Sequence, residues 1–197
     1  MSITPHIPNT TLSASALSFA YANLPLPVFN HSLRVFLLAK HLISHENTST
    51  KHYLSLPDLD LLFTACLFHD MGVCDLCNGS QRFEVEGADA ATDFLSSHHI
   101  AQEKCKDVWT AIAVHTSPGI AERISPLARV VRIAVLMDFG SPLRDEFAAR
   151  EYCDEIEEIL PRSGVEKCLG DAVVRQAVEK PERPQRLVGR MLCSRLT

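Results

Sequence analysis

Apolar residues recur every three or four positions along most of the chain, which is the spacing of helices that bury one face. Alternating runs that would indicate strands are short. The pattern therefore predicts an all-α fold, a bundle of about six to eight helices. The buried stripes are carried by Val35, Leu38 and Leu42; by Leu59, Leu62, Phe63 and Cys66; by Ala88, Ala91 and Leu95; by Val108, Ala111 and Ile112; and by Leu127, Val130, Val131 and Ala134.

Local signals mark where several of these helices begin and end. Proline disfavours helix in the residue before it, so the segment 24–27 (Leu-Pro-Leu-Pro) predicts a break and Asn30 is then a fair N-cap. Gly72 is expected to end the preceding helix in a left-handed cap. Ser125 and Pro126 predict an N-cap followed by a first-turn proline.

The chain divides into three parts by composition. Residues 1–24 are rich in Ser, Thr and Asn and predict an arm or a short lead-in helix. Residues 25–180 carry the helical pattern and are expected to form one domain, which suits a length of 197 residues. Residues 181–197 form a basic, irregular tail.

Composition indicates an ordinary globular protein. Hydrophobic residues make up 46 % and charged residues 22 %, and the net charge is −5. No global basic field is present to hold nucleic acid or an anionic membrane. Residues 1–15 lack a basic start followed by an apolar core, and no apolar stretch approaches the roughly 20 residues that span a bilayer. We expect a cytoplasmic protein, with the nucleus as an alternative.

The cysteines favour a reducing compartment. There are seven of them, an odd number that suits free thiols better than a disulfide framework. Cys74 and Cys77 have the spacing of a zinc or redox pair, but a structural zinc site needs four ligands and no second pair of this spacing exists. The two are either a functional pair or ordinary thiols in a loop.

Four side chains are candidate metal ligands: His31, His69, Asp70 and Asp138. Neighbours on a helix point about 100° apart, so His69 and Asp70 can serve one ion only near a helix end. Asp138 stands at the foot of an apolar stripe, where a carboxylate is costly unless it is paired. Arg34 is expected to be a buried partner for a carboxylate. Two imidazoles and two carboxylates suit one divalent ion, zinc first, with iron or manganese as alternatives.

The order and spacing of these residues resemble the HD superfamily of metal-dependent hydrolases. The resemblance is carried by residues 30–35 (Asn-His-Ser-Leu-Arg-Val), by residues 67–72 (Leu-Phe-His-Asp-Met-Gly), and by Asp138 after an apolar helix. It implies an all-α fold in which His31, His69, Asp70 and Asp138 hold the metal.

Further motifs are similar to the fungal cyanamide hydratase subfamily. They are Asn30 before the first His, residues 82–88 (Arg-Phe-Glu-Val-Glu-Gly-Ala), and residues 108–109 (Val-Trp) leading to 115–122 (His-Thr-Ser-Pro-Gly-Ile-Ala-Glu). This resemblance implies zinc-dependent addition of water to cyanamide, which gives urea. The tail departs from the subfamily, which usually carries a Trp-containing segment near its end, whereas Trp109 is the only Trp here.

Three further residues have predicted roles in such a reaction. His115 is expected to orient the substrate or to carry a proton to the nitrile nitrogen, unless it is a core histidine bonded to a carbonyl. Asn30 and Thr116 are expected to bind substrate or to orient the ligands, with helix capping as the alternative. The expected partner is a small neutral molecule, with no nucleic acid and no membrane, and a homo-oligomer remains open.

Two other functions remain open. HD phosphohydrolases resemble one another in a lysine after the HD-x-G segment that meets phosphate, but Val73 stands there in this chain. A nucleotide or phosphate-ester phosphohydrolase is therefore the second hypothesis. A non-catalytic HD protein that binds a metabolite is the third, although the complete ligand set argues against it.

Overall fold

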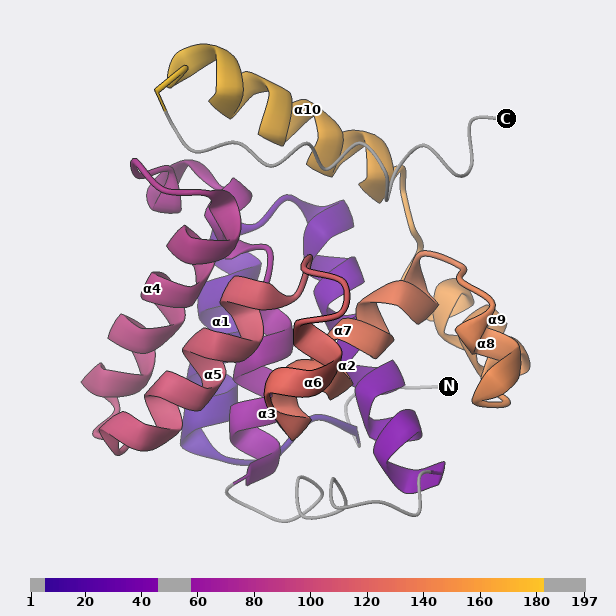
Figure 1. Ribbon diagram of the computed structural model, residues 1–197. Coiled ribbons are helices and arrows are strands. Elements are labelled where there is room, and N and C mark those ends of the chain that lie inside the picture. Colours follow the sequence, from indigo (N-terminus) through magenta and orange to yellow (C-terminus); the bar gives the residue numbers. More distant parts are fainter. Residues whose placement is uncertain (1–5, 46–57, 183–197) are drawn as a thin grey trace.

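The computed structural model describes residues 6–45 and 58–182 (Figure 1). Over these residues it contains ten α-helices, eight of them at least seven residues long, and no strands, which confirms the all-α prediction. The total exceeds the expected six to eight because α6 and α8 are four-residue helices. The helices are α1 (Thr11–Asn23), α2 (Leu26–His45), α3 (Asp58–Phe68), α4 (Phe83–Ser97), α5 (Gln102–Val114), α6 (Ala121–Ile124), α7 (Pro126–Asp138), α8 (Leu143–Glu146), α9 (Arg150–Ile159) and α10 (Val165–Glu179).

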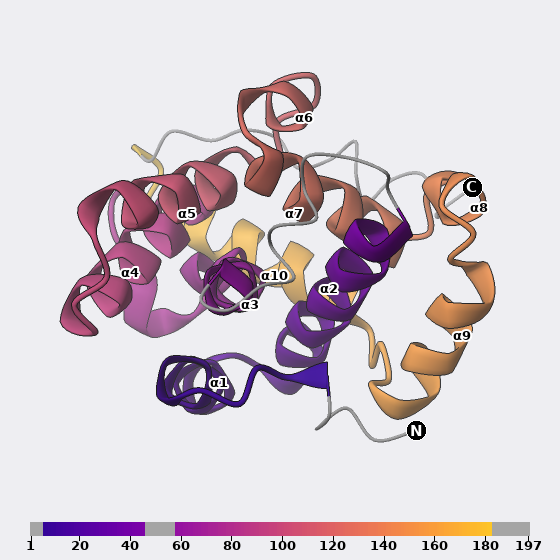
Figure 2. The same cartoon turned by 90° about the horizontal axis from the view of Figure 1, so that it is seen from below.

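Helix α3 forms the centre of the bundle. Figure 2 shows it nearly end-on, and it contacts α1, α2, α4, α5 and α7. Every residue from Asp60 to Phe68 is buried, so this helix is apolar on all sides rather than along one stripe. Its carboxyl end therefore delivers the residues that follow, His69 and Asp70, into the interior.

A buried carboxylate attaches α1 to α3. Thr10 caps α1 by accepting a hydrogen bond from the Ser13 backbone N–H. The hydroxyl groups of Thr10 and Ser13 both donate to Oδ1 of Asp60, each at 2.5 Å. Of the two forms predicted for residues 1–24, this part of the segment takes the lead-in helix. The expected division into an arm, one domain and a tail stays a prediction, and residues 183–197 of the tail lie outside the described residues.

The predicted starts of two helices had different outcomes. Helix α2 begins at Leu26, so the expectation that Asn30 is its N-cap is wrong. Pro27 lies in the first turn, where a missing backbone N–H costs no helical hydrogen bond. The start of α7 is confirmed, since the Ser125 side chain accepts from the Ala128 N–H and Pro126 follows it.

Gly72 has a steric role rather than the predicted capping role. The glycines with positive φ are Gly119, Gly140 and Gly164, so the left-handed cap expected at Gly72 is wrong. Helix α3 ends at Phe68, and Gly72 lies in a short 3₁₀ turn, Met71–Val73. A Cβ atom at Gly72 would lie 1.9 Å from the Phe83 carbonyl oxygen. Glycine is required here because the loop meets the backbone at the start of α4.

Helix α10 covers one side of the molecule. It lies across the top of the bundle in Figure 1 and contacts α2 and the 3₁₀ turn that contains Gly72. Its Gln176 side chain donates to the Gly72 carbonyl oxygen at 2.8 Å. Among the helices in the described part of the chain, none has both the length and the apolar character needed to cross a membrane.

The contact between Gly72 and Phe83 predicts a large stability effect. Gly72→Ala should lower the free energy of unfolding by about 2–3 kcal/mol, because backbone must shift to admit the methyl group. Gly164→Ala is the matched control: its φ is +73° but no atom lies within 4 Å of the added Cβ, so it should cost only about 1 kcal/mol. Urea unfolding of both variants measures the difference. Equal costs would contradict the steric role.

Candidate metal centre

Five buried residues from four helical segments surround the candidate site. His31 lies within α2, His69 and Asp70 follow α3, His115 caps the end of α5, and Asp138 is the last residue of α7. Each is at most 4 % exposed. The helices that carry them pack against one another, α2 on α3 and α7, and α3 on α5.

Three of these residues point ligand atoms at one another. Nε2 of His31 lies 3.1 Å from Nε2 of His69. Oδ2 of Asp70 lies 3.4 Å from the His31 Nε2 and 3.1 Å from the His69 Nε2. All three offer a ligand atom within 4.8 Å of the others, which is the arrangement of a metal-binding group. The sequence predicts these three residues as candidate metal ligands, and the structure brings them together.

The other ring nitrogens fix where the protons lie. Nδ1 of His69 is 2.8 Å from the carbonyl oxygen of Cys66. Nδ1 of His31 is 2.7 Å from Oδ2 of Asp138. Carbonyl and carboxylate oxygens only accept, so each Nδ1 carries the proton and each neutral ring turns an Nε2 lone pair toward Asp70. Lone pairs gathered in this way, beside a carboxylate, require positive charge among them, and a divalent cation fits this donor set.

The pKa directions differ among the three residues. Burial lowers the pKa of His31, against the opposing effect of Asp138. For His69 burial also lowers the pKa, but the charge of Asp70 outweighs it and the net direction is upward. Burial would raise the pKa of Asp70, but the neighbouring His69 and His115 hold it well below its usual value, so Asp70 is a carboxylate at neutral pH.

Asp138 contacts the centre through His31. Besides the His31 ring, its two oxygens accept hydrogen bonds from Nε and Nη2 of Arg34, at 2.7 and 3.0 Å. The expectation that Arg34 is a buried partner for a carboxylate is confirmed, since its side chain is fully buried in this ion pair. A carboxylate on the far nitrogen of a ligating histidine fixes the ring orientation and raises its basicity. The role of Asp138 as a fourth ligand stays a prediction.

Two arginines that the sequence did not single out hold Asp138 in place. Arg144 donates to the carbonyl oxygens of Met137 and Asp138, at 2.5 and 2.8 Å. Arg162 donates to the Asp138 carbonyl oxygen at 2.7 Å. These bonds satisfy backbone acceptors that the end of α7 leaves without helical partners. Both arginines follow α7 in the chain, and no local pattern signals that they return to it.

His115 lies beside the three-residue group. Its Nδ1 is 2.7 Å from the Ile112 carbonyl oxygen, and its Nε2 is 3.5 Å from Oδ1 of Asp70. The backbone of His115 is held by Arg132, whose Nη1 donates to the His115 carbonyl oxygen at 3.1 Å. The ring therefore turns its Nε2 toward the centre. Its predicted catalytic role stays a prediction.

Thr116 binds a buried carboxylate that the sequence did not identify as functional. Its hydroxyl donates to Oε1 of Glu84 at 2.5 Å, and Arg82 contacts the same oxygen at 2.6 Å. Burial would raise the pKa of Glu84, but Arg82, the nearby His115 and Thr116 lower it, so Glu84 is ionised. A glutamate in the first turn of a helix is common at exposed positions, where it complements the helix dipole, so its burial has no signal in the sequence.

Asn30 lies next to His31 on α2 but bonds elsewhere. Its Nδ2 donates to the carbonyl oxygen of Pro161 at 3.1 Å, in the connection between α9 and α10. This contact fastens that connection to the side of α2 that carries His31. Substrate binding by Asn30 stays a prediction.

A family model with the description HD domain matches residues 28–134, more than half of the 197-residue chain. The chain belongs to the HD domain family. The match contains His31, His69, Asp70 and His115 and ends four residues before Asp138. HD domain proteins bind divalent metals and are generally metal-dependent hydrolases. The search of curated proteins finds no match to this chain.

Removing either adjacent ligand of this HD domain should empty the centre. We expect His69→Ala and Asp70→Ala to reduce the bound metal from about one ion per chain to less than about a tenth of that. Elemental analysis by plasma mass spectrometry measures the metal content. His98→Ala, at the end of α4, serves as a histidine control that should keep the full content. Full metal content in either ligand variant would refute the assignment.

Proposed function

We propose that the protein is a metal-dependent hydratase that adds water to a small neutral nitrile, with cyanamide as the first candidate and urea as the product. The observation that carries the proposal is that His31, His69 and Asp70 meet in the interior, with Nε2 of His115 beside them. The resemblance of the surrounding motifs to cyanamide hydratases supplies the substrate class. The expected metal is zinc, with iron or manganese as alternatives.

The charges around the centre support a neutral substrate over a phosphate. Val73, in the position where a phosphate-binding lysine is expected, is buried and apolar. Arg34 is paired with Asp138, and Arg82 is paired with Glu84. The arginines that contact residues of the site are therefore already neutralised by carboxylates, and an anionic substrate gains little from them.

Nitrile hydration makes demands that these residues meet. A divalent ion held by His31, His69 and Asp70 supplies Lewis-acid activation of water. The carbon gains an oxygen, the nitrogen gains protons, and no group leaves, so proton transfer is the main task left to the protein. His115 meets this task because its Nδ1 proton is held by the Ile112 carbonyl while Nε2 faces the centre.

Thr116 favours cyanamide among small nitriles. The single hydroxyl proton of Thr116 is donated to Glu84, so its oxygen can only accept a further hydrogen bond. Cyanamide carries an amino group that donates, whereas an alkyl nitrile or an isonitrile has no N–H. A site whose polar group stays unpaired with the wrong substrate discriminates strongly against it.

The direct test is urea formation from cyanamide by the purified full chain. We expect turnover that a chelator abolishes and that added zinc, iron or manganese restores. Acetonitrile, which lacks an N–H donor, is the matched poor substrate. Phosphate release from nucleotides without any urea would favour the phosphohydrolase alternative. Absence of turnover on every candidate in a metal-loaded sample would favour a non-catalytic metabolite-binding protein.

Variants of the adjacent pair His115 and Thr116 separate their two roles. His115→Ala should keep its metal and lose about 10²–10⁴-fold in kcat, because the proton relay is removed. Thr116→Val should raise KM for cyanamide about tenfold through one lost hydrogen bond. Thr110→Val, a half-buried position on α5, is the control and should leave both constants unchanged. Loss of metal from His115→Ala would make this residue a ligand instead.

A further inference from the structure

Two cysteines lie together in the loop that follows the His69–Asp70 pair. Cys74 precedes a 3₁₀ turn, Asp75–Cys77, in which the Cys77 backbone N–H donates to the Cys74 carbonyl oxygen at 3.2 Å. This backbone hydrogen bond closes the turn between the two cysteines, and their side chains are close enough for each to shift the pKa of the other. Neither cysteine belongs to the group of ligands formed by His31, His69 and Asp70.

This contact favours a thiolate at one cysteine and a thiol at the other. The hydrogen bond from the Cys77 thiol, with backbone N–H groups of Leu76 and Cys77, lowers the pKa of Cys74 to about 7 against the opposing effect of burial. The same bond raises the pKa of Cys77. Burial instead raises the pKa of Cys66, and it raises the pKa of Cys153 to about 11. Cys74 and Cys77 therefore differ from these structural thiols.

The pair is accessible from one side. Cys77 is half-buried, and together with Leu76 it lines an open groove between α1 and α4. Cys74 is not among the residues that line this groove and is 5 % exposed. A small reagent therefore meets the Cys77 sulfur first, with the Cys74 sulfur positioned to react next.

We propose that Cys74 and Cys77 form a redox-active dithiol, which low-molecular-weight disulfides such as glutathione disulfide oxidise reversibly to an intraloop disulfide. Cys77 passes its proton to the Cys74 thiolate and, as a thiolate itself, attacks the glutathione disulfide. This forms a mixed disulfide and releases one glutathione thiolate, which takes the proton from Cys74. Cys74 then attacks the Cys77 sulfur and releases the second glutathione. Two cysteine sulfurs are oxidised and one disulfide is reduced. The one thiol proton of the pair and one proton from solvent end on the two glutathiones.

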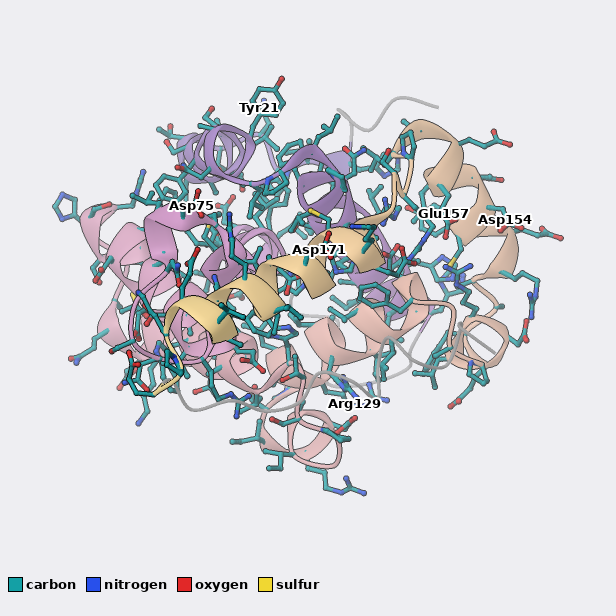
Figure 3. All side chains as sticks on the ribbon, turned by 90° about the horizontal axis from the view of Figure 1, so that it is seen from above. Tyr21, Asp75, Arg129, Asp154, Glu157 and Asp171 are labelled. Atoms are coloured by element: carbon teal, nitrogen blue, oxygen red, sulfur yellow. The ribbon has the colours of Figure 1, made fainter. Side chains whose placement is uncertain are left out.

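Oxidation of Cys74 and Cys77 should change the contacts that this loop makes with α10. Gln176 donates to the Gly72 carbonyl oxygen, Arg175 pairs with Asp75 at 2.8 Å, and Lys180 donates to the Gly79 carbonyl oxygen at 2.8 Å. Figure 3 looks onto α10, with Asp75 labelled on the loop that it contacts. A disulfide needs an S–S separation of about 2.05 Å, so it draws the Asp75–Cys77 turn tighter and moves the partners of α10.

Thiol counting tests the proposed dithiol without reference to any enzyme activity. The reduced full chain is treated with glutathione disulfide at neutral pH, then acid-quenched, denatured and labelled with N-ethylmaleimide for intact mass measurement. We expect five of the seven cysteines to be labelled, with no glutathione retained on the protein. Dithiothreitol should restore labelling of all seven. Peptide mapping of the wild-type chain should place the bond between Cys74 and Cys77.

Three variants complete the test. Under the same treatment, Cys74→Ser and Cys77→Ser should each form no intrachain disulfide, so neither variant should lose two thiols together. Cys105→Ser, which removes a buried cysteine elsewhere, is the matched control and should still lose two. The proposal is overturned if the wild-type chain keeps all its thiols, stops at a glutathione adduct, or forms its disulfide between other cysteines.

Hydrogen exchange tests the effect on α10. Backbone amides of Val165–Glu179 should exchange several-fold faster in the oxidised protein than in the reduced protein, and Cys74→Ser should show no difference between the two treatments. Identical exchange in the oxidised and reduced wild-type proteins would contradict the link between the loop and α10.

Discussion

Buried lone pairs that face one another must be matched by positive charge, and this constraint organises the molecule. The Asp138 carboxylate is matched by Arg34 and by the Nδ1 proton of His31. That same proton leaves the His31 Nε2 lone pair turned toward His69 and Asp70. The unmatched negative potential is thereby concentrated at one point, where a divalent cation fits. Helices α2, α3 and α7 are held together by this chain of contacts as well as by their apolar faces.

The position of the centre follows from how α3 is packed. A helix that is buried on all sides has no exposed end for the residues after it, so His69 and Asp70 remain in the interior. The loop then passes so close to the start of α4 that only glycine fits at position 72. The next residue after Phe83 is Glu84, and the close passage thus places its carboxylate beside Thr116. One steric contact therefore links the ligand corner to the proposed substrate-binding side.

From the sequence alone we could predict the features that helical periodicity and neighbouring residues determine. The apolar stripes located the helices, and the pair Ser125 and Pro126 located the start of α7, because these signals lie within a few residues of the structure they produce. The steric role of Gly72 and the buried contacts of Glu84 and Arg162 depend on chain segments far apart, and no local pattern reports them. Position alone identified Asp138 as a carboxylate in need of a partner. It did not reveal that His31 and Arg34 are those partners.

One cation is expected to lie among His31, His69 and Asp70. Anomalous diffraction from crystals of the metal-loaded protein, collected on both sides of the metal absorption edge, tests this claim most directly. We expect a single strong peak about 2.0–2.2 Å from the Nε2 atoms of both histidines and from a carboxylate oxygen of Asp70. A peak at another place in the molecule, such as beside Cys74 and Cys77, with none among these three side chains, would contradict it.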